Sequence, residues 1–161
     1  MKRLGGILRM HTDAFDEIVF DKRAFLKAGA IVLLVAVLGS LRWSLSSASP
    51  WITFLGMAVS SWLGWYFFAS SMGFLARLLW DMPVETRELL SVTGYSFLPL
   101  IFLSLPYVGW ISIVWFLGVL YLGLRYIYML TVPRTLLLIV IGSLVAFFVW
   151  GMANLLIAVI L

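Results

Sequence analysis

The 161-residue chain is 64% hydrophobic and only 11% charged. A soluble domain carries roughly a quarter charged residues and could not bury this much apolar surface in one core of such a size, so a lipid bilayer is the expected solvent. The lack of cysteine and the single histidine exclude disulfides, iron–sulfur clusters, thiolate zinc sites and polyhistidine metal sites.

The first 26 residues form a mixed polar and apolar segment, too long and too polar before the first apolar run for a removable signal peptide. Its apolar residues fall at helical spacing, which predicts one or two amphipathic helices lying on the inner membrane surface. This segment could anchor the first span or present a docking surface for a cytoplasmic partner. The spaced apolar residues are Leu4, Ile7, Leu8, Phe15, Ile18 and Val19.

The remainder, residues 27–161, is predicted to be an all-α, polytopic membrane bundle of five helices. A spanning helix needs about 20 mostly apolar residues, and stretches without charge supply them. The uncharged stretch 89–124 is too long for one helix and contains a turn signal from Pro106 to Gly109, so it is divided there. The predicted spans cover residues 27–45, 51–75, 89–105, 108–127 and the last uncharged stretch, 135–161.

The third predicted span, residues 89–105, is short and contains Pro99. Because proline has no backbone N–H and crowds the preceding turn, we expect a kink at this position.

Basic residues set the expected orientation. With five spans, every lysine and arginine except Arg42 falls on one side of the membrane, whereas four or six spans would distribute them over both sides. Because basic residues are retained in the cytoplasm, we expect a multi-pass protein of the cell (cytoplasmic) membrane with its N-terminus inside and its C-terminus outside. The net charge of +4 follows from this topology, so nucleic acid is not an expected partner.

Little in the spans suggests chemistry. Apart from Arg42, and from Lys27 and Arg125 at the span ends, they contain no acid, base or histidine, which argues against an ion-coupled transporter. Their serines have no base to activate them. Asp81, Glu85 and Glu88 could bind a cation, but an acidic start of the third span explains them better. We therefore expect no enzyme, no catalytic residue, no cofactor and no metal.

Small and polar residues in the spans are candidates for packing. Gly56, Ser60 and Gly64 are spaced four apart, a pattern that lets membrane helices approach closely, within one chain or between chains. Asn154 is the only amide and needs a hydrogen-bond partner in hydrocarbon. That partner could be Ser91, Thr93 or Tyr95 across the bundle, a lipid head group or another subunit.

The order of motifs in the second half of the chain resembles a known family. Gly94 and Tyr95 are followed by Pro99, then by the turn at 106–109, a tryptophan-containing span and a short basic loop. Together with residues 14–25, this order resembles the Yip family of Ypt/Rab-interacting membrane proteins, in its compact prokaryotic branch. The resemblance implies five spans with a cytoplasmic N-terminus. Eukaryotic members associate with each other and with Rab-type GTPases, a role that does not transfer to a prokaryotic chain.

Three functions fit these observations. The first is a membrane scaffold or interaction protein that binds itself or another integral membrane protein. The alternatives are an accessory subunit of a larger membrane complex, and a lipid- or small-solute-handling protein in which the kinked third span and Asn154 line a path. The candidate packing or interaction residues are Gly56, Ser60, Gly64, Gly94, Tyr95, Pro99 and Asn154.

Overall fold

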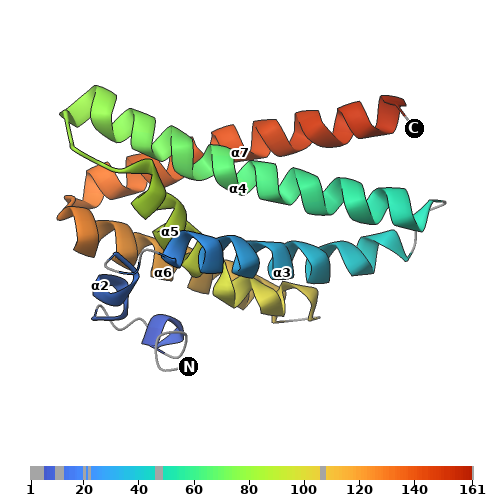
Figure 1. Ribbon diagram of the computed structural model, residues 1–161, viewed down its shortest axis with the longest axis horizontal. Helices are drawn as coiled ribbons and strands as arrows, with labels where there is room; N and C mark the ends of the chain where they lie inside the picture. Colours follow the sequence, from blue (N-terminus) through green and yellow to red (C-terminus); the bar gives the residue numbers. More distant parts are fainter. Residues whose placement is uncertain are drawn as a thin grey trace.

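The computed structural model describes residues 6–9, 13–19, 21, 23–45, 49–105 and 108–160, and within these ranges it contains helices and no strand. Figure 1 shows the helices gathered into one elongated bundle. The predicted all-α membrane bundle is therefore confirmed. The elements are α2 (Asp13–Val19), α3 (Ala24–Ser44), α4 (Pro50–Trp80), α5 (Thr86–Ser96), the 3-10 helix η1 (Leu98–Ser104), α6 (Gly109–Tyr128) and α7 (Val132–Ile160).

Four of these helices are long and apolar enough to cross a membrane: α3, α4, α6 and α7. They correspond to the first, second, fourth and fifth predicted spans. Helix α4 has 31 residues, or about 46 Å at 1.5 Å per residue, which exceeds the roughly 30 Å of a hydrocarbon core. It begins with Pro50, which suits a first helical turn. It is capped by Asp81, which has a left-handed backbone (φ 50°) and donates its N–H to the Ala76 and Arg77 carbonyls.

The third predicted span is broken into two helices. Helix α5 ends at Phe97, and Pro99 lies in the first turn of η1, where its missing N–H is not needed. The kink expected at Pro99 is therefore confirmed. Eleven α-helical residues and seven 3-10 residues have a combined rise of about 30 Å, because the 3-10 helix advances about 2.0 Å per residue. The broken element is thus as long as a hydrocarbon core is thick.

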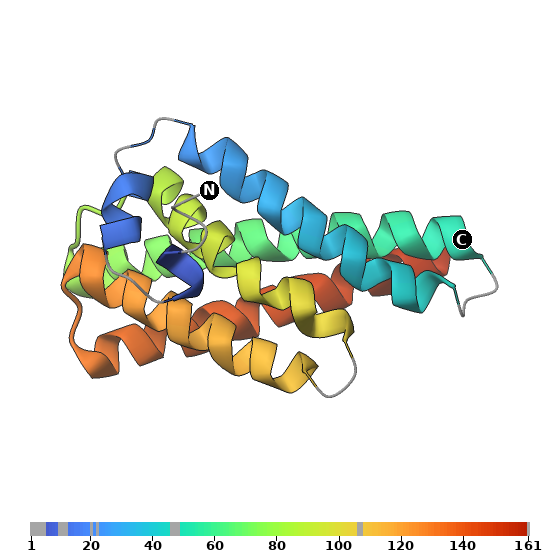
Figure 2. The same cartoon turned by 90° about the horizontal axis from the view of Figure 1, so that it is seen from below.

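Helix α4 is the centre of the bundle. It packs most extensively on α7 and α3, while α5 and η1 pack on α3 and α6. Helix α7 contacts α6 only slightly. Figure 2 shows η1 and α6 as a hairpin that ends short of the far ends of α3 and α4.

The N-terminal helix packs on protein rather than on the membrane surface. Helix α2 contacts α5 and α6, and Ile7, Phe15 and Ile18 are completely or almost completely buried. The sequence predicted that the membrane surface covers the apolar face of this helix. That prediction is wrong, because α5 and α6 cover it. Helix α3 begins at Ala24, three residues before the predicted start, and the division into 1–26 and 27–161 stays a prediction.

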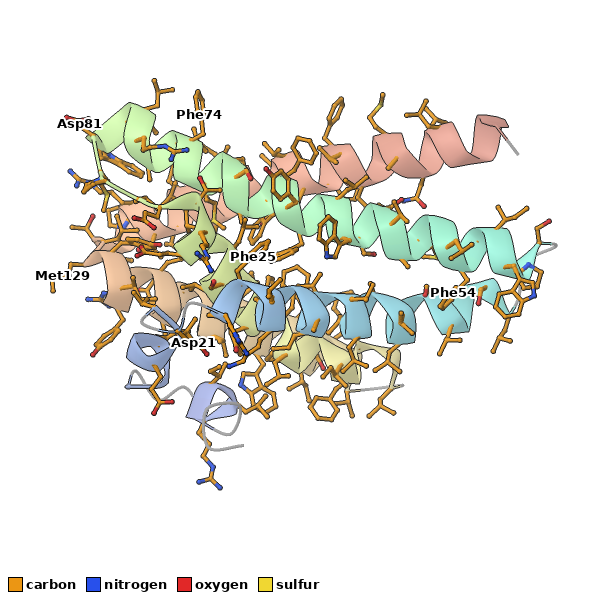
Figure 3. All side chains as sticks on the ribbon, viewed as in Figure 1. Asp21, Phe25, Phe54, Phe74, Asp81 and Met129 are labelled. Carbon is orange, nitrogen blue, oxygen red and sulfur yellow. The ribbon has the colours of Figure 1, made fainter. Side chains whose placement is uncertain are left out.

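Charged side chains gather at one end of the bundle, which we call the charged end and define by Asp21, the 81–88 segment, Arg125 and Arg134. Figure 3 shows Asp21, Asp81 and Met129 at this end and Phe54 at the opposite one. An ion pair joins the Lys27 ammonium to Asp21 at 2.6 Å. The α2–α3, α4–α5 and α6–α7 connections thus lie at one end of the bundle, and the predicted orientation in the membrane stays a prediction.

Candidate functional site: the bundle centre and the aromatic groove

Trp65 occupies the centre of the bundle, where α3, α4 and α5 meet. Its side chain is 1% exposed, and its indole N–H donates to the Thr93 hydroxyl oxygen at 3.0 Å. The Thr93 hydroxyl in turn donates to the Leu89 carbonyl at 2.7 Å. Phe25 stacks on the Trp65 ring with centroids 6.2 Å apart. The indole nitrogen is the single polar atom of the Trp65 side chain, and its hydrogen bond offsets the cost of burying it.

Gly94 permits the closest approach at this centre. A Cβ added at Gly94 would lie 2.7 Å from the Ala28 Cβ and 3.1 Å from Cζ2 of Trp65. Helices α3 and α5 can therefore meet at this distance only because residue 94 has no side chain. Tyr95 and Pro99, predicted with Gly94, are also buried. All three sequence candidates on this element thus face the protein interior.

Two of the three small residues on α4 are inside the bundle. Ser60 is fully buried, and its hydroxyl has no hydrogen-bond partner among the described residues. Gly64 faces α7, since a Cβ there would lie 3.8 Å from the Ala146 carbonyl oxygen. Gly56 is partly exposed. The Gly56–Ser60–Gly64 spacing therefore serves packing of α4 within this chain at Ser60 and Gly64.

Asn154 makes a hydrogen bond within its own helix. Its amide nitrogen donates to the Trp150 carbonyl, one turn earlier in α7, at 2.7 Å. The predicted cross-bundle partners have intrahelical bonds of their own, since Ser91 donates to the Arg87 carbonyl and Thr93 to Leu89. This bond satisfies one N–H donor of the Asn154 amide within α7 itself.

The charged end is held by local polar contacts. Arg77 donates to the Val84 carbonyl at 3.2 Å, and the Arg134 guanidinium lies 5.4 Å from the centre of the Trp80 ring. Among the described residues, no group of three or more histidine, cysteine, aspartate or glutamate side chains could hold a metal ion.

Glu88 is the acid at this end whose surroundings shift its titration. Partial burial raises the pKa of the Glu88 carboxyl, and the neighbouring Glu85 carboxylate raises it further. The Tyr128 hydroxyl opposes this rise in pKa, although its oxygen does not reach hydrogen-bonding geometry with any described group. Glu88 is therefore a carboxyl that resists ionisation more than a free glutamate does.

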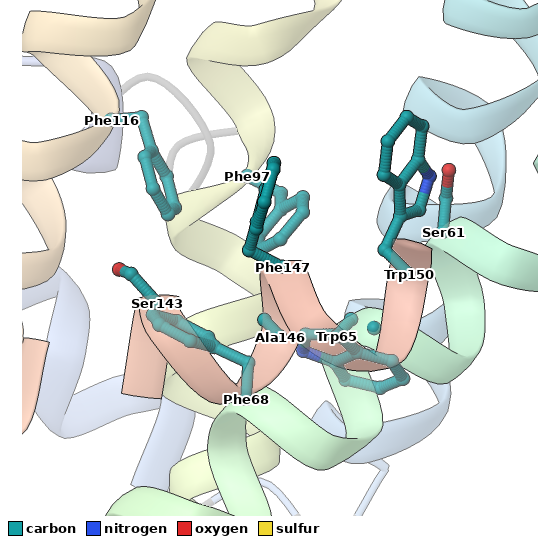
Figure 4. A pocket seen from close by; sticks show the side chains of 10 residues that line it. Ser61, Trp65, Phe68, Phe97, Phe116, Ser143, Ala146, Phe147 and Trp150 are labelled. Atoms are coloured by element: carbon teal, nitrogen blue, oxygen red, sulfur yellow. The ribbon is translucent and has the colours of Figure 1, made fainter. Parts of the chain in front are cut away.

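An open groove of about 320 Å³ lies between α4, α7 and the η1–α6 hairpin. Figure 4 shows aromatic side chains around it, with Phe116 from α6, Phe97 from the α5–η1 junction, and Phe147 and Trp150 from α7. The Phe97 and Phe116 rings meet edge to face, with centroids 5.1 Å apart. We call this space the aromatic groove. Its lining residues are Ser61, Gly64, Trp65, Phe68, Phe97, Phe116, Ser143, Ala146, Phe147 and Trp150.

Sequence reasoning missed Trp65, Gly123 and the groove. A Cβ at Gly123 would lie 2.7 Å from the Phe15 ring and 3.0 Å from the Val92 side chain, so Gly123 forms the notch that receives α2. Both residues stand in long apolar stretches, where composition does not separate buried from lipid-facing positions. The Phe-Phe and Phe-x-x-Trp pattern at 147–150 was the one visible signal of an aromatic wall.

These features define a class. Four apolar helices long enough to span a membrane, a buried core between them and most charges at one end make the chain a multi-pass membrane protein. Comparison with protein-family models matches residues 5–154 to the Yip1 domain. The chain therefore belongs to the Yip1 family, as the motif order indicated, and this family consists in general of non-enzymatic membrane proteins. Searches of curated proteins and of solved structures gave no match.

Proposed function

We propose that this chain is a non-enzymatic membrane scaffold or interaction protein, which binds another integral membrane protein through an exposed stripe on α7. The stripe consists of Leu144, Phe148, Gly151 and Leu155. The three large side chains are 64%, 68% and 60% exposed, and a Cβ at Gly151 would meet no heavy atom within 4 Å.

The spacing of these residues supports a contact surface. Steps of four, three and four residues keep all of them on one helical face. A glycine offers lipid no apolar side chain, but it lets the backbone of a second helix approach closely. Because α7 packs mainly on α4, the opposite face of α7 is available. The open glycine within an apolar stripe is the observation that carries the proposal.

The proposed partner is a second copy or a different membrane protein. We place the charged end in the cytoplasm of the cell, because basic residues are retained there, and the stripe then lies in the outer half of the bilayer. A foreign subunit in fixed ratio would make this chain an accessory component of a larger complex, and the same stripe would serve that role.

The test compares two leucine substitutions in reconstituted nanodiscs. Gly151→Leu is expected to reduce co-purification of a differently tagged copy or of the partner subunit, because the added side chain blocks helix approach. Gly39→Leu is the matched control, since a Cβ at Gly39 also meets nothing within 4 Å, but on α3. Mass spectrometry of the intact assembly gives the readout. Unchanged association in Gly151→Leu, or equal loss in both variants, would contradict the proposal.

A further inference from the structure

We propose that the aromatic groove is a binding site for the hydrocarbon chain of a single membrane phospholipid. The site is separate from the α7 stripe, so this inference does not depend on the proposed function. Four elements build it, namely α4, the α5–η1 junction, α6 and α7.

The depth of the groove indicates a hydrocarbon occupant. Its residues on α4 run from Ser61 to Phe68, and those on α7 from Ser143 to Trp150, which are the middle parts of both helices. If these helices cross the bilayer along their length, the groove lies near the midplane, where acyl chains and no head groups are found. Water does not fill such a space, because an apolar cavity stays dry.

The lining chemistry excludes a charged ligand. No charged side chain is among the lining residues, so the walls complement a neutral molecule only. The indole N–H of Trp65 is already bonded to Thr93, which leaves the carbon face of that ring for the groove. The other polar groups among the lining residues are the hydroxyls of Ser61 and Ser143 and the indole N–H of Trp150, and all of them are uncharged. A flexible, uncharged chain matches this surface.

The size of the groove suits one hydrocarbon chain. It holds about 320 Å³ between α4, α7 and the hairpin. A linear hydrocarbon chain is much narrower than an α-helix with side chains, which is about 10 Å wide, and it can enter between α7 and the hairpin. The weak contact between α6 and α7 provides the lateral opening towards the bilayer.

The experiment uses the full chain in vesicles that contain phosphatidylcholine with a photoreactive diazirine near the end of one acyl chain. After illumination, mass spectrometry maps the labelled residues. Labelling is expected to concentrate several-fold on groove residues such as Phe97 and Phe147 relative to the exposed Val59 on α4. A diazirine placed near the glycerol end of the acyl chain should label the groove much less.

Groove-filling variants give the second arm. Ser143→Phe from α7 and Ser61→Phe from α4 fill the same space from opposite walls, so a folding failure in one leaves the other informative. Both are expected to lose most groove labelling, whereas Val59→Phe on the exposed face of α4 keeps it. Uniform labelling of groove and exposed positions overturns the proposal. So does groove labelling that neither filled variant changes.

Discussion

At the scale of single residues, glycines decide where helices of this chain touch. Gly94 brings α3 against α5 and Gly142 brings α7 against α4, since a Cβ at either would lie 2.7 Å from a neighbouring side-chain atom. Gly39 and Gly151 have open space instead. Gly39, Gly142 and Gly151 stand in similarly apolar stretches of the sequence, so their different roles could not be separated by composition.

Gly94→Ala is expected to destabilise the bundle by about 1–3 kcal/mol, because the new methyl group overlaps Ala28 and overpacking a tight core costs that much. Ala28→Gly in the same chain should restore most of the loss by removing the opposing methyl. Gly39→Ala is the control and should be neutral or slightly stabilising, since alanine favours helices. Thermal unfolding in detergent, monitored by circular dichroism, gives the order of stability of these variants. Equal effects at 94 and 39 would contradict the close contact.

Glu88 links one residue to the pH dependence of stability. Its pKa in the folded state is raised by burial and by Glu85, so its ionisation favours unfolding, and stability should fall as pH rises through the raised pKa. Glu88→Gln carries no charge and should be more stable than the parent at pH 7, with a smaller difference at acidic pH. Because Glu88 is only partly buried, solvent screening keeps the effect small. The free energy of unfolding of the parent and of Glu88→Gln is measured from pH 4 to pH 8. A constant difference between the two over this range would contradict the prediction.

At the scale of elements, the sequence predicted those features that depend only on the residues of one segment. The length of a charge-free stretch determines whether a helix can span hydrocarbon, and four predicted spans are continuous helices. The kink at Pro99 followed from one missing N–H. The packing of α2 could not be predicted in the same way, because helical periodicity shows which face is apolar but not whether lipid or protein covers it.

The docking of α2 can be tested from both sides of one contact. Phe15→Ala removes a fully buried ring, and Gly123→Ala places a methyl group 2.7 Å from that ring. Both should release α2 while the long helices remain, because α2 touches only α5 and α6 extensively. Hydrogen exchange at residues 13–19 should then accelerate strongly in both variants. Leu26→Ala, on an exposed part of α3, should leave it unchanged. Full protection in Phe15→Ala would show that the contact does not hold α2.

At the scale of the whole molecule, the arrangement of charge follows from the number of crossings. The charged end collects three connections, and this is possible only if the broken α5–η1 element returns the chain across the bundle as a continuous helix would. The 3-10 part compensates for the small number of residues, because it rises further per residue than an α-helix. The summed rise of the two parts, about 30 Å, equals the thickness of a hydrocarbon core.

This topology can be measured directly, because the chain has no cysteine and single cysteines can be introduced without background. Asp81→Cys and Met129→Cys, at exposed positions of the charged end, should react with a membrane-impermeant maleimide only after intact cells are permeabilised. Ser49 precedes α4 and Val108 precedes α6, and both are exposed positions away from the charged end. Ser49→Cys and Val108→Cys should react in intact cells. If α5–η1 did not cross, Asp81 and Val108 would share one side and Met129 would lie on the other. A complete reversal of the pattern would instead keep five crossings and place the charged end outside, against the retention of basic residues in the cytoplasm.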